Sequence, residues 1–250
     1  QGITLNRLND REALRAAFDN FRREADSKGI AESMDVYHQQ ALGILTTSAL
    51  VEALDLSKED PKVLARYGEN DPKYQRDGAP KMVRNFCIAR RLVEAGARVV
   101  SLNYSRWDWH GGDGMNFPRS RQEFPLLDQG MSALVTDLHE RGLDKDVSVV
   151  LWGEFGRTPK INTRTTEGGR DHYPRCMFML MAGGGVQGGR VLGESDDKAT
   201  LPAAEGFSPD DVAASFYHGL GIDHTKEYHT DSGRPVMIVR NGTVIRDLFA

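Results

Sequence analysis

Titratable side chains gather in three short polar segments of this 250-residue chain, each beside an apolar run. In the first segment, Asp108 and His110 stand two positions apart. Side chains two positions apart in an extended segment point the same way, so this carboxylate and imidazole can meet at one metal ion. Such a pair in a loop is also common as a turn or cap, so a purely structural role remains open.

The other two segments add candidate ligands of the same kind. Glu154 follows the apolar run 146–152, and Asp171 and His172 come shortly before the apolar run 176–182. Asp171 can equally cap a turn, and His172 can be a structural histidine. Oxygen and nitrogen donors suit Zn²⁺, Mn²⁺ or Mg²⁺ better than a metal that seeks thiolates. We therefore expect a divalent cation (Zn²⁺, Mn²⁺, Mg²⁺ or Ca²⁺) held or oriented by Asp108, His110, Glu154, Asp171 and His172.

Arg157 is the candidate catalytic side chain. It lies three positions after Glu154, and its planar guanidinium matches two oxygens of a phosphate or sulfate group. Arg170 offers the same chemistry. The alternative is a surface ion pair between Arg157 and Glu154.

Other sites known from their motifs are not indicated. The chain has no Gly-x-Ser-x-Gly sequence, which excludes that type of serine nucleophile. Cys87 and Cys176 have no metal-ligand spacing. The literal GxGxxG at 183–188 is followed by further glycine rather than a helix, so we interpret it as a tight turn beside the site.

The elements that must position these residues indicate an α/β domain. Apolar, β-branched runs at 97–104, 146–152 and 176–182 predict strands covered on both faces, and the helices between them predict a mainly parallel sheet sandwiched by helices. Ligands bind beyond the carboxyl ends of such strands. We expect one domain over 1–250, with a helical region at about 9–95 and the strand-bearing core at about 97–250.

Helix periodicity and capping residues refine this outline. We expect a loop with one helical turn at 63–66 and a terminal hairpin joining 236–239 to 243–245. The expected helices cover about 10–27, 31–45, a short stretch from Ser48, 82–95, 118–141, and a late helix that Ser208 caps.

Composition excludes two classes of partner. The formal net charge is −4 with both signs mixed along the chain, so nothing predicts nucleic-acid binding. No apolar stretch is long enough for a membrane span.

Three strands are few for a sheet of this size, and the chain opens without Met, so we expect an N-terminal portion to be missing.

The motif segments resemble a bacterial family, the domain of unknown function 1501, from Leu5 to Phe249. The resemblance is carried by residues 107–111, 153–159, 169–172, 182–189 and 233–236. That family is placed in the alkaline-phosphatase-like superfamily with phosphatases and sulfatases. The resemblance implies a metal centre at the carboxyl edge of a parallel sheet, with Asp108, His110 and His172 as ligands. It also implies an exported or periplasmic protein.

Two departures from the superfamily pattern leave the function open. Residues 153–156 supply one carboxylate, Glu154, and no histidine, and the superfamily's N-terminal nucleophile has no counterpart here. The first hypothesis is a metal-dependent hydrolase of phosphate or sulfate esters acting on a small-molecule or glycan substrate. The alternative is a non-catalytic binding or scaffold protein. Trp107 and Trp109 flank Asp108 and suggest recognition of sulfated or phosphorylated glycans, unless both pack in the core.

Overall fold

The computed structural model describes residues 48–249 except 77, 112–115, 167 and 204–205. Backbone packing divides the chain into two compact units, Gln1–Asp55 and Leu56–Ala250, and the single domain expected over 1–250 stays a prediction. The described part of the first unit contains helix α3 (Ser48–Leu54), as predicted. The helices expected at about 10–27 and 31–45 lie outside the described residues.

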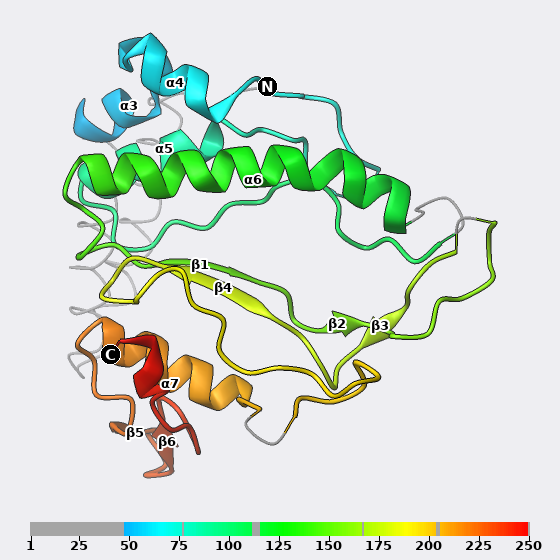
Figure 1. Ribbon diagram of the computed structural model, residues 1–250. Helices are drawn as coiled ribbons and strands as arrows, with labels where there is room; N and C mark the ends of the chain where they lie inside the picture. Colours follow the sequence, from blue (N-terminus) through cyan, green and yellow to red (C-terminus); the bar gives the residue numbers. More distant parts are fainter. Residues whose placement is uncertain (1–47, 77, 112–115, 167, 204–205, 250) are drawn as a thin grey trace, which may run out of the picture. The chain divides into compact units, whose positions relative to one another are not determined.

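Helices in the first part of the second unit carry most of its core. After η1 (Leu56–Lys58) come α4 (Pro61–Tyr67), α5 (Asn85–Glu94) and the long α6 (Asn116–Glu140), which runs along α4 and α5 (Figure 1). Helix α4 is a full helix because Pro61 opens it and the Asp60 side chain accepts from the Lys62 amide; we expected a single turn there. The core is made of Tyr67, Val83, Phe86, Cys87, Tyr104, Ala133, Leu134 and Leu138.

The strands of the second unit form short antiparallel pairs. Strand β1 (Val149–Trp152) pairs with β4 (Met179–Ala182), inside the two apolar runs expected to be strands. Strand β2 (Gly156–Arg157) pairs with β3 (His172–Tyr173). The β1–β4 pair lies between α6 and α7 (Pro209–Gly219) in Figure 1. The described ladders are antiparallel where we expected parallel ones, and the larger parallel sheet stays a prediction.

The strand expected at 97–104 is wrong for the described residues. This segment forms no ladder with the described residues, and Val99 is 86% exposed. A β-branched sequence favours extended backbone, but a strand also needs a neighbour to accept and donate its hydrogen bonds.

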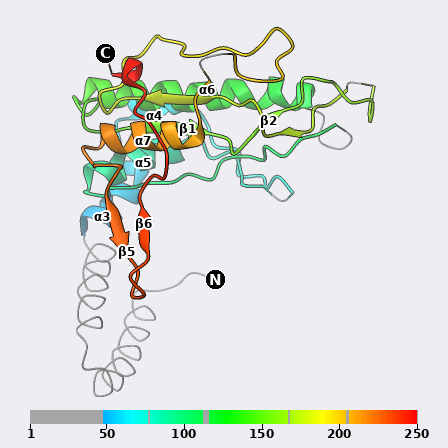
Figure 2. The same cartoon turned by 90° about the horizontal axis from the view of Figure 1, so that it is seen from below.

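The C-terminal part is organised by α7, which is capped by Ser208 as predicted, within a capping box that Ser208 forms with Asp211. The expected hairpin is wrong: β6 (Pro235–Met237) pairs with β5 (Glu227–His229) instead (Figure 2). Residues 243–245 form no strand because α7 side chains bind their amides. The Thr243 amide donates to Asp211, and the Ile245 amide donates to Ser215. The chain then turns through η3 (Arg246–Leu248). Among the described helices, none is long and apolar enough to cross a membrane.

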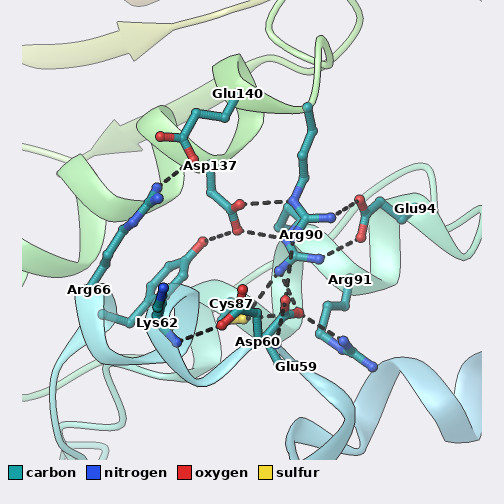
Figure 3. A network of polar contacts seen from close by, with 12 residues as sticks. Glu59, Asp60, Lys62, Arg66, Cys87, Arg90, Arg91, Glu94, Asp137 and Glu140 are labelled. Atoms are coloured by element: carbon teal, nitrogen blue, oxygen red, sulfur yellow. Dashed lines mark hydrogen bonds and ion pairs between the residues drawn. The ribbon is translucent and has the colours of Figure 1, made fainter.

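A buried ionic network ties Glu59, the residue after η1, to α5 and α6 (Figure 3). The Arg90 guanidinium, 1% exposed, donates to Asp137 at 2.8 Å, to Glu59 at 2.6 Å and to Glu94 at 2.6 Å. The Tyr67 hydroxyl also donates to Asp137, at 2.9 Å. Because each buried charge has an opposite partner, the network is compatible with burial, and removal of Arg90 would take away a charged partner of all three carboxylates.

Candidate metal centre

Three of the predicted ligands lie together: the imidazoles of His110 and His172 both contact one carboxylate oxygen of Asp108. Oδ1 of Asp108 lies 2.6 Å from Nε2 of His110 and 2.8 Å from Nε2 of His172. The ligand atoms of these three side chains all lie within 4.8 Å of one another. Hydrogen bonds from His172 and His110 hold the pKa of Asp108 at about 2, so its carboxylate is ionised across the physiological pH range.

Two short backbone contacts bring the ligand segments together. Strand β3 carries His172 and pairs it with Arg157 on β2. On the other side, the backbone of Gly169 lies against His110: a Cβ atom at Gly169 would stand 2.0 Å from the His110 carbonyl oxygen. Gly111 has a φ of 103°, in the region that glycine adopts readily. Close approach of the two segments therefore requires glycine at position 169, and the positive φ favours glycine at position 111.

Asp171 orients a candidate ligand from behind. Its Oδ1 lies 3.2 Å from Nδ1 of His110, on the opposite side of the ring from Asp108. Arg164 contacts the same oxygen at 3.0 Å, and the Asn162 amide contacts Oδ2 at 3.3 Å. Burial opposes ionisation of Asp171, but the hydrogen bonds from His110 and Asn162 lower its pKa below the ordinary value. Asp171 was predicted among the ligands, and its position is that of an orienting carboxylate.

Arg157 lies beside the three candidate ligands with one donor unused. Its Nη2 donates to the Trp107 carbonyl oxygen at 2.8 Å and lies 3.8 Å from Oδ1 of Asp108. Its Nη1 is buried and has no hydrogen-bond partner among the described residues. Burial lowers the pKa of Arg157, and the charge of Asp108 counteracts this. An acceptor oxygen brought by a ligand would satisfy Nη1.

Two other predicted residues are not brought into the cluster. Glu154 is exposed and forms no ion pair with Arg157 among the described contacts, so the expected alternative of a surface pair is not observed. The guanidinium of Arg170 is used internally, because Nε donates to the Thr158 carbonyl at 2.6 Å and Nη2 to the Arg157 carbonyl at 3.1 Å. Arg170 therefore holds β2 rather than facing a ligand.

Sequence reasoning missed several residues around the cluster. Asn162 donates to the His110 carbonyl at 2.7 Å, and the Phe155 ring lies 4.2 Å from the His172 ring, between centroids. Asn116 contacts both ligand segments. Trp109 is buried, whereas Trp107 is exposed and stacks on Phe124 at 5.9 Å between ring centroids. The idea that both tryptophans stack on a sugar therefore fails for Trp109.

The chain matches the model of one protein family over residues 1–249, described as "Protein of unknown function (DUF1501)". The match covers nearly the whole chain, and the chain belongs to this family. No curated protein and no solved structure matches it.

Proposed function

We propose that the chain binds a divalent metal ion through Asp108, His110 and His172, as part of a hydrolase of phosphate or sulfate esters related to the alkaline-phosphatase-like superfamily. The observation that carries this proposal is the convergence of two imidazole nitrogens on Oδ1 of Asp108, at 2.6 and 2.8 Å. The Asp171 carboxylate behind His110 is the usual partner of a metal-binding histidine.

The donor set decides which metals fit. Two imidazoles and one carboxylate favour Zn²⁺ or Mn²⁺ over Mg²⁺ and Ca²⁺, which prefer oxygen ligands. The same set also suits Fe²⁺. When bound, a cation here supplies Lewis-acid stabilisation of the negative charge that builds on a transferring phosphoryl or sulfuryl group.

Arg157 supports the assignment of an anionic substrate. A buried donor without a partner costs about 1–3 kcal/mol, and Nη1 of Arg157 is such a donor. Its other nitrogen, Nη2, is held by the Trp107 carbonyl and lies beside Asp108. In the proposed function, Nη1 donates to a non-bridging oxygen of the ester and orients it toward Asp108, His110 and His172.

The superfamily resemblance supplies the remaining parts of the proposal. Among the described residues, those that meet in the centre include no serine, threonine or cysteine. We propose that the nucleophile comes from an N-terminal portion of the full-length protein, and that this protein is exported. A small-molecule or glycan ester is the proposed substrate.

A second function is favoured by the exposure of the centre. The side chain of Asp108 is 58% exposed and that of His172 is 45% exposed, whereas catalytic metal sites commonly lie in a dry, shaped cavity. This observation supports a member of the fold that binds a phosphorylated or sulfated ligand, glycans included, without turning it over.

Metal analysis of the purified protein tests the first proposal. The chain would be stripped with chelator, reconstituted with each cation, desalted and measured by mass spectrometry of the elements. We expect about one ion per chain for the native protein, loss of that ion in His110→Ala, and full retention in His229→Ala, which removes an exposed histidine of β5. No retained ion with any cation, or equal retention in both variants, rejects the centre.

Ester assays then separate the two functions. The metal-loaded full-length protein would be assayed with aryl phosphates and aryl sulfates. Turnover that His172→Ala abolishes supports the hydrolase. Binding of inorganic phosphate or sulfate without turnover of any ester supports the non-catalytic alternative.

A further inference from the structure

One amide side chain joins the two segments that carry the candidate ligands. Asn116, the first residue of α6, is buried. Its Nδ2 donates to the Trp109 carbonyl at 2.5 Å, and its Oδ1 accepts from the Arg170 amide at 2.7 Å. Trp109 lies between Asp108 and His110, and Arg170 precedes Asp171 and His172. The amide therefore bridges the two backbone segments that carry the candidate ligands.

The two hydrogen bonds require both ends of an amide. A carboxamide offers a donor and an acceptor on one carbon, whereas a carboxylate offers only acceptors. An aspartate at position 116 would keep the bond from Arg170 but place a carboxylate oxygen against the Trp109 carbonyl. Because the side chain is buried, water cannot replace the lost donor, and the carbonyl of Trp109 would be left unpaired.

The Trp107–His110 segment is held by a row of such contacts. The carbonyls of Trp107, Trp109 and His110 accept from Arg157, Asn116 and Asn162, respectively. Of these three donors, Asn116 is the one carried by α6, whose residues Ala133, Leu134 and Leu138 are buried in the core. Asn116 therefore links both ligand segments to the helix that contributes these core residues.

We propose that Asn116 is a positioning residue of the candidate metal centre. It touches none of the ligands, yet its amide sets the separation between the Asp108–His110 pair and His172. It thereby determines the affinity and the coordination geometry of a metal bound there. This inference rests on the proposed metal centre, and it adds a residue outside the ligand set.

The test uses Co²⁺ as a spectroscopic probe in the purified chain. Native protein, Asn116→Asp and Asn116→Gln would be titrated with Co²⁺ while the visible d–d absorption is recorded. Asn70→Asp is the matched control, since Asn70 accepts from the Arg84 amide and contacts neither ligand segment. Thermal unfolding of the metal-free proteins separates general loss of stability from a local effect.

We expect Asn116→Asp to weaken Co²⁺ binding about 10-fold or more and to change the absorption bands, as loss of an outer-shell partner does. Asn116→Gln keeps both polar groups on a longer side chain, and we expect it to restore part of the affinity with shifted bands. Asn70→Asp should match the native protein in both readouts.

The positioning role would be overturned if both Asn116 variants had the Co²⁺ affinity and the absorption bands of the native protein. It would also be overturned if both metal-free variants were unfolded, because Asn116 would then be a residue of general stability. Absence of Co²⁺ binding in the native protein is a different result: it rejects the metal centre itself and, with it, this inference.

Discussion

Nδ1 of His110 lies 3.2 Å from Oδ1 of Asp171, a residue 61 positions further along the chain. A proton on Nδ1 that is donated to Asp171 leaves the lone pair of Nε2 free to bind a metal. Nε2 faces Oδ1 of Asp108 at 2.6 Å, and a lone pair would repel that oxygen. The contact is stable only with a proton or a cation between the two atoms, so metal binding should displace a proton.

Loss of Asp171 should weaken metal binding without removing a ligand. We expect Asp171→Ala to lower the affinity for Zn²⁺ or Mn²⁺ about 10- to 100-fold, because its carboxylate orients His110 and selects the metal-binding tautomer. Calorimetric titration measures this change. The control is Asp144→Ala, which removes another carboxylate that contacts an imidazole, that of His139 at 2.8 Å. Equal affinities in the two variants would remove the orienting role.

The glycine motif beside His110 can be tested by adding one methyl group. In Gly169→Ala the new Cβ would stand 2.0 Å from the His110 carbonyl oxygen, so the two ligand segments must separate. We expect loss of metal binding and a lower melting temperature. Gly188→Ala is the matched control, because a Cβ there meets nothing within 4 Å. A native metal affinity in Gly169→Ala would show that the close approach is not needed.

The candidate ligands could be predicted from the sequence because their residue types and spacing suffice to identify them. Asp108, His110 and His172 were chosen for carboxylate and imidazole chemistry, and the structure places them together. Glu154 was chosen by the same reasoning, yet it is exposed and stays apart from the cluster. Residue type alone does not distinguish it, because its orientation depends on the turn between β1 and β2.

Residues that act through tertiary contacts could not be predicted. Asn116 bonds the Arg170 amide across 54 positions, and its sequence neighbours give no indication of that contact. Strands β2 and β3 have two residues each, too few for a period-2 pattern. The capped helix at Ser208 was predicted correctly because its determinants are local. The pairing of β5 with β6 was not predicted, because it depends on the binding of residues 243–245 by side chains of α7.

The ionic network around Arg90 should make stability depend on Glu59. The Glu59 carboxylate contacts Arg90 at 2.6 Å and Arg91 at 2.8 Å. Burial raises its pKa, but the hydrogen bonds from Arg91 and Arg90 prevail and lower the pKa from 4.5 to about 2. We expect Glu59→Gln to lower the free energy of unfolding at pH 7 by about 2–3 kcal/mol, because it removes one of the three carboxylates around the buried Arg90 guanidinium and the charged acceptor of Arg91.

The pH dependence of this loss has a definite sign. The Glu59 carboxylate has a lower pKa in the folded protein than in the unfolded chain, so it contributes its full stabilisation at pH values above the unfolded-state pKa. This contribution to the free energy of unfolding disappears as the pH falls from about 4.5 toward 2. Urea unfolding at several pH values should show the difference between the native protein and Glu59→Gln shrinking through that window. Glu69→Gln is the control: the Glu69 side chain is 83% exposed in its ion pair with Arg84, and it should cost at most about 1 kcal/mol at any pH.

Arg157 should contribute to anion binding more than to metal binding. We expect Arg157→Ala to retain the metal and to bind inorganic phosphate about 10- to 100-fold more weakly, as the loss of one charged hydrogen bond implies. Calorimetry of the metal-loaded variants measures both affinities. Arg190→Ala removes an exposed guanidinium that contacts the Asp247 carbonyl and should leave both unchanged. Unaltered phosphate affinity in Arg157→Ala would refute the clamp.

Anomalous X-ray diffraction from crystals of the metal-loaded protein tests the central claim most directly. Data collected above and below the absorption edge of Zn or Mn locate the ion without assumptions about its ligands. The account predicts one strong anomalous peak bounded by Oδ1 of Asp108 and the Nε2 atoms of His110 and His172, the three atoms that already converge. Loaded crystals that show no peak there, or a peak held by other residues, would contradict it.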